Sequence, residues 1–354
     1  MQSLLDREDE LTATIRHNAA RAGAVKDPEK AREAAFKAWR TMRRRAREAE
    51  RLKFQGLGLE RFLETRFTVP ASVRVGKYRI NPPLVKSSKL TYVEKGGVGK
   101  QLSDGWVVNF AVGCTHGCVF CYVDEIHKKF GERRAGPIVY EKWGDYFAVP
   151  ENIEEAIEAT PWEKWKGVEV MLSSTHDAYL PQLIRWTRRI LEKALPDGVK
   201  FCIQTRSPLV ERDFGLLSEF RGQVRLQVSV ATSSPDFARL IEPRVVTPER
   251  RFEILRRAKD AGLTTGIILA PIFPDNPRRK NYGSDMRALF SRLAELRPDH
   301  IYGESVHVRG VNLAAIEEVI GERLRLWGFD REAESLFKRQ LRYYNLQGIW
   351  WPEH

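Results

Sequence analysis

From Trp106 onward, short runs of apolar residues alternate with segments that have the pattern of amphipathic helices. The apolar runs occupy residues 106–112, 168–173, 199–205, 224–231, 264–270 and 299–306, and helices are predicted at 181–195, 210–220, 247–261 and 283–296. Strands that are apolar throughout and separated by helices are typical of a parallel sheet that is buried on both faces. We therefore expect an α/β fold, either a partial or full barrel or a doubly wound sheet, with ligands bound at the carboxyl ends of the strands.

The region before the first apolar run has a different pattern. Asp27 and Pro28 suit the N-cap and the first position of a helix, and no Gly or Pro follows them up to residue 53. Apolar residues at helical spacing form one stripe of this segment: Ala35, Trp39, Met42, Ala46 and Ala49. We expect a basic α-helical N-terminal extension at 1–66, an irregular connector at 67–104, the barrel at 105–310 and a mostly helical C-terminal segment at 311–354.

Composition and charge exclude some classes of protein. The 354 residues include four cysteines, too few for a secreted fold built on disulfides. No apolar stretch is long enough to span a membrane, and the N-terminus lacks the apolar centre of a signal peptide, so we expect a cytoplasmic protein. The net charge of +12 favours a polyanionic partner, although a charge-rich surface is also typical of adaptation to heat.

Three of the four cysteines lie within eight residues, directly after the first predicted strand. They are Cys114, Cys118 and Cys121, with the spacing C-x3-C-x2-C. Three thiolates at this spacing can bind three irons of a [4Fe–4S] cluster. The fourth iron is then open to the amino and carboxylate groups of S-adenosylmethionine (SAM), and Phe120, just before the third cysteine, can pack against the adenine.

Two other interpretations of the cysteines are open. A structural zinc site closes with four ligands, so His116 or His127 would have to supply the fourth, and a second pair of ligands is missing from the sequence. The thiols could also be inert buried side chains, although such thiols do not usually cluster in this way.

The sequence resembles the radical SAM superfamily, and within it the branch of spore photoproduct lyase, from about Leu84 to Pro274. The resemblance is carried by the cysteine loop and by the segments SSTHDAY at 173–179, QTRSPLV at 204–210, VSVAT at 228–232, Glu242–Pro243, Arg250–Arg251 and API at 270–272. It implies a partial (βα)6 barrel with the cysteine loop after its first strand.

The resemblance also implies which residues contact the cofactor. Ser174 would bind the amino group of its methionine moiety, Arg206 the carboxylate, and Ser229 and Ala270 the ribose and adenine. The structural alternatives are strand packing for the serines and Ala270, and for Arg206 an ion pair with a carboxylate such as Asp177.

The resemblance to the lyase is incomplete on the substrate side. The lyase has a hydrogen-donor cysteine just before the serines of the second strand, where this chain has Met171–Leu172, and a tyrosine where this chain has Phe120. The remaining thiol, Cys202, lies within the third strand and is either a small buried apolar residue or a donor. Candidates for catalysis are therefore Tyr122, Cys202 and Glu304, the last of which would face the barrel mouth together with His307.

We therefore expect an enzyme that cleaves SAM reductively to a 5′-deoxyadenosyl radical, with an external electron donor, and acts on a nucleic acid as a repair lyase or modifying enzyme. Phosphates would be contacted by arginines of the helix at 27–53, namely Arg40, Arg43, Arg44, Arg47 and Arg51. Further contacts would come from Arg133–Arg134, Arg278–Lys280 and the pairs Tyr343–Tyr344 and Trp350–Trp351. The alternatives are an RNA- or ribosome-associated binding protein with a retained cluster, and a radical enzyme for a peptide or small molecule.

Overall fold

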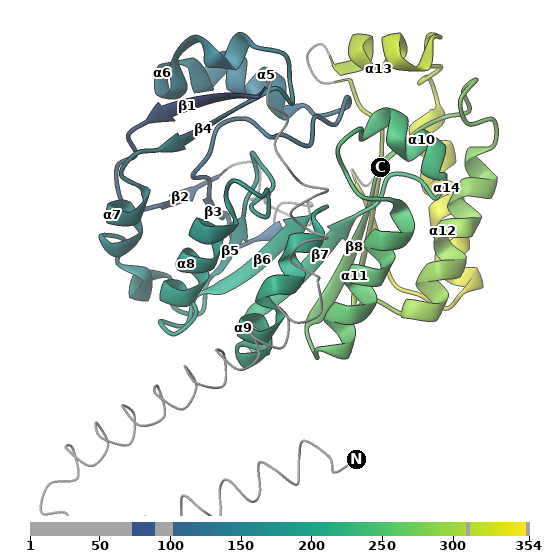
Figure 1. Ribbon diagram of the computed structural model, residues 1–354. Coiled ribbons are helices and arrows are strands. Elements are labelled where there is room, and N and C mark those ends of the chain that lie inside the picture. Colours follow the sequence, from purple (N-terminus) through teal and green to yellow (C-terminus); the bar gives the residue numbers. More distant parts are fainter. Residues whose placement is uncertain (1–72, 89–101, 309–311, 352–354) are drawn as a thin grey trace, which may run out of the picture. The chain divides into compact units, whose positions relative to one another are not determined.

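The computed structural model describes residues 73–88, 102–308 and 312–351 (Figure 1). The chain divides into two compact units, Met1–Phe67 and Thr68–His354. The first unit lies outside the described residues, and so do the predicted basic helix at 27–53 and its arginines. The second unit contains the sheet and the cysteine loop.

An eight-stranded sheet forms the centre of the second unit. Seven of its strands run parallel, and six of these correspond in order to the six apolar runs: β3 (Trp106–Val108), β5 (Glu169–Leu172), β6 (Lys200–Thr205), β7 (Val224–Ser229), β8 (Thr264–Ile272) and β9 (His300–Ser305). β2 (Val85–Ser87) adds an antiparallel edge beside β3, and β10 (Ile349–Trp351) adds a parallel edge beside β9. Among the described strands these two edges do not pair with each other. The predicted α/β partial barrel is confirmed.

Helices cover the outer face of the sheet (Figure 1). Four of them match the predicted positions: α8 (Ile184–Ala194), α9 (Phe214–Glu219), α11 (Pro248–Asp260) and α12 (Tyr282–Leu296). The Thr247 side chain accepts the N–H of Arg250 at the start of α11, and Pro248 occupies its first turn. Residues 210–213, predicted as the beginning of a helix, belong instead to a 3-10 helix, Pro208–Asp213, that leads into α9.

A second, two-stranded sheet pairs β1 (Arg74–Tyr78) in parallel with β4 (Tyr146–Pro150). Between them the chain forms α5 (Val123–Ile126), a π-helix (His127–Gly131), α6 (Glu132–Ala135) and a 3-10 helix (Gly136–Tyr140). α7 (Ile153–Glu158) and the 3-10 helix Trp162–Trp165 follow β4. The connector predicted as irregular therefore contains two strands. They escaped prediction because most side chains of β1 and β2 are exposed, so neither strand has an apolar run.

The C-terminal segment consists of α13 (Asn312–Ile320), α14 (Phe329–Tyr343) and the edge strand β10. Trp350 of β10 is fully buried, and its ring centroid lies 5.3 Å from that of Phe337 on α14. Gly303 makes this packing possible, because a Cβ at that position would lie 2.6 Å from Phe337 and 2.7 Å from Trp350. Trp350 is therefore part of the hydrophobic core and is not available for stacking on a base.

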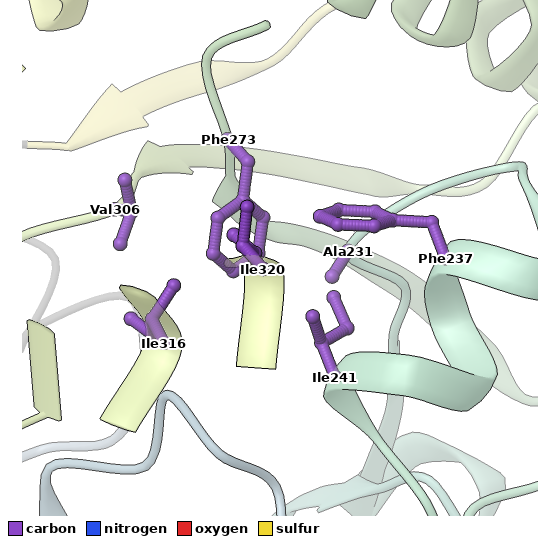
Figure 2. Close-up of a cluster of buried hydrophobic side chains, with 7 residues drawn as sticks. All are labelled: Ala231, Phe237, Ile241, Phe273, Val306, Ile316 and Ile320. Atoms are coloured by element: carbon purple, nitrogen blue, oxygen red, sulfur yellow. The ribbon is translucent and has the colours of Figure 1, made fainter. Parts of the chain in front are cut away.

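The loops at the carboxyl ends of the strands lead into α5, α10 (Pro235–Ile241) and α13, which lie at the same end of the sheet in Figure 1. A cluster of buried apolar side chains joins α10 and α13 to the ends of β7, β8 and β9 (Figure 2). Its members are Ala231, Phe237, Ile241, Phe273, Val306, Ile316 and Ile320. Among the described residues, no helix is long and apolar enough to cross a membrane.

Candidate active site

A cavity of about 440 Å³ opens at the carboxyl ends of the parallel strands, where the fold predicts a ligand site. Its lining includes most of the residues that the sequence singled out. They are Cys114, Cys118, Phe120, Cys121, Tyr122, Ser174, Arg206, Ala270, Glu304 and His307. Two of the predicted site residues, Ser229 and Cys202, are fully buried and lie outside this lining.

The cysteine loop is held by close backbone packing. Gly113 has φ of +90°, and a Cβ there would lie 2.6 Å from the carbonyl oxygen of Tyr146. Gly117 packs on Gly144, whose own Cβ would lie 2.7 Å from the Gly117 Cα. The Arg244 guanidinium donates to the Gly144 carbonyl. These contacts require glycine and fix the path of the loop beside β4.

The three thiols fit a cluster better than a single metal ion. Burial raises the pKa of Cys114 and Cys121 to about 12 and also raises that of Cys118, so the thiols stay protonated unless bound iron supplies positive charge. Within the described part of the chain, no three His, Cys, Asp or Glu side chains surround a position for one metal ion. A [4Fe–4S] cluster places each thiolate on a different iron, so its ligands need not converge on one point.

The two histidines considered as zinc ligands have other contacts. His127 is buried, and its Nδ1 accepts the N–H of Gly113 at 3.0 Å. Burial lowers the pKa of His127 to about 4, so the ring is neutral and acts as an acceptor. His116 Nε2 lies 2.9 Å from Asp177 Oδ2. Both rings support the cysteine loop.

Asp177 connects the cysteine loop to the end of β6. Its buried carboxylate accepts hydrogen bonds from His116, from the Thr205 hydroxyl at 2.7 Å and from the Arg206 N–H at 2.8 Å. Burial alone would raise the pKa of Asp177, but these hydrogen bonds lower it to about 2. The group is therefore an ionised acceptor, and His116 donates from Nε2.

Arg206 pairs with Glu242 rather than with Asp177, the partner considered from the sequence. Arg206 Nε donates to Glu242 Oε1 at 2.8 Å, and the fully buried Arg251 donates to the other carboxylate oxygen at 2.5 Å. The guanidinium carbon of Arg206 lies 5.6 Å from the ring centroid of Phe120. Arg206 is thus held at the cavity wall by an ion pair on one side and an aromatic ring on the other.

Asn109 and Gln204 were not identified from the sequence. Asn109 follows β3; its Oδ1 accepts the backbone N–H of Ser174 at 2.9 Å and its Nδ2 donates to the Ser174 hydroxyl at 2.9 Å. Gln204 lines the cavity from β6 and donates to the Ser229 hydroxyl at 3.2 Å, so Ser229 lies behind it. Asn109 follows β3 and Gln204 is the last residue but one of β6, so both lie at the carboxyl end of a strand, and that position is the signal that would have found them.

The side of the cavity formed by β9, β10 and α13 carries different groups. Glu304 and His307 line it as predicted, 3.6 Å apart, and Asn312 donates to the carbonyl oxygens of His307 and Phe120. Trp351 of β10 also lines the cavity and is paired in register with Glu304. Of the aromatic pair at 350–351, only Trp351 reaches the site.

The remaining residues predicted to contact a nucleic acid differ in their exposure to solvent. Arg279 is buried, donates to the Phe273 carbonyl at 2.5 Å and lies 3.4 Å from Asp285, so it stabilises the loop before α12 and is not available to phosphates. Arg133 is exposed on α6, and Tyr343 is 77% exposed at the end of α14.

Comparison with known proteins agrees with this geometry. The sequence profile of the radical SAM superfamily matches residues 108–282. An uncharacterized protein of Acidianus two-tailed virus is 54% identical over 282 residues, which are 79% of this chain and 94% of that protein. An uncharacterized protein of Methanocaldococcus jannaschii is 28% identical over 172 residues, which are 48% of this chain and 61% of that protein.

Solved structures of spore photoproduct lyase share the fold. A point mutant of that enzyme matches with a TM-score of 0.54 at 16% identity, over 78% of this chain and 80% of the lyase. A double mutant with bound AdoMet and dinucleoside spore photoproduct matches with a TM-score of 0.51 at 15% identity, over 70% of this chain and 76% of the lyase. The chain belongs to the radical SAM superfamily and is an enzyme of that class.

Proposed function

We propose that the chain is an iron–sulfur enzyme that cleaves SAM reductively and acts on a nucleic acid. The observation that carries the proposal is that one cavity at the carboxyl ends of the strands is lined by the three cysteines together with Ser174, Arg206 and Ala270. When bound to the cysteines and reduced by an external electron donor, a [4Fe–4S] cluster would supply the electron that splits SAM into methionine and a 5′-deoxyadenosyl radical.

The protein's own residues bind and orient the cofactor. Glu242 engages Nε of Arg206, and among the described residues the terminal nitrogens form no hydrogen bond, so they are free to pair with the methionine carboxylate. Asn109 fixes Ser174, whose hydroxyl is the proposed contact of the amino group. Ala270 and Phe120 offer apolar surface to the adenine and ribose. Gln204 on β6 makes the cofactor contact that the sequence predicts for Ser229, because Ser229 on β7 lies behind it.

The substrate would enter on the side of Glu304, His307 and Trp351. A nucleic acid is supported by the net charge of +12, by an aromatic side chain and polar groups on that side, and by the likeness in fold to a lyase whose structures hold a dinucleoside photoproduct. Met171 lines the cavity where the lyase has its donor cysteine, whereas Cys202 is fully buried and does not line the cavity. The proposed reaction therefore does not use Cys202 as the hydrogen donor.

Anaerobic reconstitution with iron and sulfide, followed by dithionite and SAM, tests the proposal. We expect 5′-deoxyadenosine, and its yield should change when RNA or DNA is added. Absence of cleavage, with stable co-sedimentation on RNA-containing particles, would favour the binding protein instead. Cleavage of SAM that responds to peptide pools and not to nucleic acid would favour a radical enzyme for a peptide or small molecule.

A further inference from the structure

The loop at 321–328, between α13 and α14, has an alternating pattern of burial. Arg323, Arg325 and Trp327 are exposed, whereas Leu324 and Leu326 are partly buried and pack against the apolar cluster of α10 and α13 (Figure 2). The loop is fixed at its centre because the Leu324 N–H donates to Glu317 Oε1 at 2.9 Å. Its leucines anchor the loop, and its arginines and tryptophan are directed to solvent.

Trp327 is unusual for a residue of its size. It is 99% exposed, although tryptophan is on average among the more buried residues. Neither Arg323 nor Arg325 forms an ion pair with a described acidic residue, while many other arginines of the described chain do. Two unpaired guanidinium groups beside an exposed indole combine positive charge with a stacking surface.

This loop and the wall of the active-site cavity pack against the same apolar cluster. The cluster beneath Leu324 and Leu326 also packs against Phe120, which lines the cavity. Asn312, at the start of α13, donates to the Phe120 carbonyl at 3.3 Å and lines the cavity as well. A chain-like ligand that reaches the cavity can therefore continue across the loop.

We infer that the loop 321–328 binds a single-stranded nucleic acid next to the active site, with Trp327 stacked on a base and Arg323 and Arg325 on phosphates. This inference rests on the proposed nucleic-acid substrate and names the surface that holds it. Stacking on an exposed aromatic ring and pairing of arginines with phosphates are the two contacts by which proteins bind single strands without reading their sequence. Exposed tryptophan and arginine also occur at protein–protein interfaces. The net charge of +12 favours a polyanionic partner here, and a protein partner is the rival outcome of the test.

Fluorescence anisotropy of labelled single-stranded oligonucleotides, with the full chain, provides the test. We expect Trp327→Ala to weaken binding about fivefold or more, because base stacking contributes about 1–3 kcal/mol and 1.4 kcal/mol is tenfold. Trp327→Phe should restore most of the affinity. Changing both Arg323 and Arg325 to Gln should lower the slope of log K against log salt by about 1.4, since each contact with a single strand contributes about 0.7.

Matched controls lie elsewhere on the same surface. Tyr140→Ala removes another exposed aromatic ring, at the end of the 3-10 helix Gly136–Tyr140, whose hydroxyl donates to Glu132. Arg292→Gln removes an exposed charge from α12. Both should bind as the parent protein does. A halogenated uracil in the oligonucleotide should also cross-link to the peptide that contains Trp327.

The outcomes separate this inference from the proposed function. If the parent protein binds oligonucleotides and Trp327→Ala binds equally well, the loop is not the contact surface, but a nucleic-acid substrate stands. If the parent protein binds no oligonucleotide, both are wrong.

Discussion

Replacing Arg206 with Ala removes the guanidinium that lies between the cavity, Glu242 and the ring of Phe120. Because hydrogen bonds to charged groups contribute about 1.5–3 kcal/mol, we expect the affinity for SAM to fall about ten- to a hundredfold. The contact to Glu242 through Nε at 2.8 Å keeps the side chain in place before the cofactor binds, so little ordering opposes binding.

The same substitution also lowers stability. Glu242 is fully buried and would keep only Arg251 as an ionic partner, at 2.5 Å. Leaving a buried carboxylate without any ionic partner costs about 3–5 kcal/mol. Because Glu242 keeps Arg251, we expect the free energy of unfolding to fall by about 1–3 kcal/mol. Arg206→Lys keeps the charge but loses the Nε–H, and should fall between the parent and the alanine variant.

Anaerobic calorimetry with reconstituted protein measures the affinity, and iron content and thermal unfolding are measured on the same samples. Arg250→Ala is the matched control, because it breaks the ion pair to Glu211, at 2.6 Å, whose residues do not line the cavity. It should leave the affinity for SAM unchanged. If Arg206→Ala, with its full iron content, binds SAM as tightly as the parent protein, then Arg206 does not hold the cofactor carboxylate.

Three other perturbations test different parts of the molecule. Cys121→Ala should abolish the visible charge-transfer band and the binding of about four irons, whereas Cys202→Ala should leave both intact; a bound zinc without iron would contradict the cluster. His127 and His176 are buried, and burial lowers their pKa values to about 4 and about 3, so their contribution to stability is complete above pH 6.5 and is lost as the pH falls toward those values. As the pH falls from 6.5 to 5, each histidine should lower the free energy of unfolding by about 2 kcal/mol. Replacing either histidine by Gln should reduce this change in the free energy of unfolding by about half. Changing Arg43, Arg44 and Arg47 to Glu should weaken nucleic-acid binding at low salt, while SAM cleavage persists. Unaltered binding at moderate salt would contradict a role of these arginines in binding.

Six of the parallel strands could be predicted because each contains several apolar residues and predicted helices separate most of them. β7 is buried at every position, although its sequence VRLQVS alternates apolar and polar residues. β1 could not be predicted in this way, since only Tyr78 of its five residues is buried and its partner β4 lies more than sixty residues further along the chain. Such pairing depends on the tertiary fold and leaves little trace in a local pattern.

The residues of the candidate site likewise include some that the sequence predicts and some that it does not. The cysteines, Ser174 and Arg206 belong to motifs that can be read in a few consecutive residues. The ionic partner of Arg206 could not be predicted, because Glu242 is 36 positions away and only the tertiary fold brings the end of α10 within 2.8 Å of the residue that follows β6. For Trp351 the difficulty was orientation, since neighbouring residues of a strand face opposite sides and no pattern at 349–351 shows which tryptophan faces the cavity.

One side of the cavity therefore concerns the cofactor, and the other side concerns the substrate. The cysteine loop, Asp177 and Arg206 are tied together by buried hydrogen bonds and ion pairs, and this is the side that lies within the matched profile at 108–282. Glu304, His307 and Trp351 lie beyond residue 282, on β9, β10 and the loop before α13. Cofactor chemistry can be common to proteins that share only the first side, while the choice of substrate depends on the second. Besides Met171, the groups that distinguish this enzyme's substrate from that of the lyase should accordingly be sought after residue 300. Replacing Trp351 or Glu304 should change the dependence on substrate before it changes the cleavage of SAM.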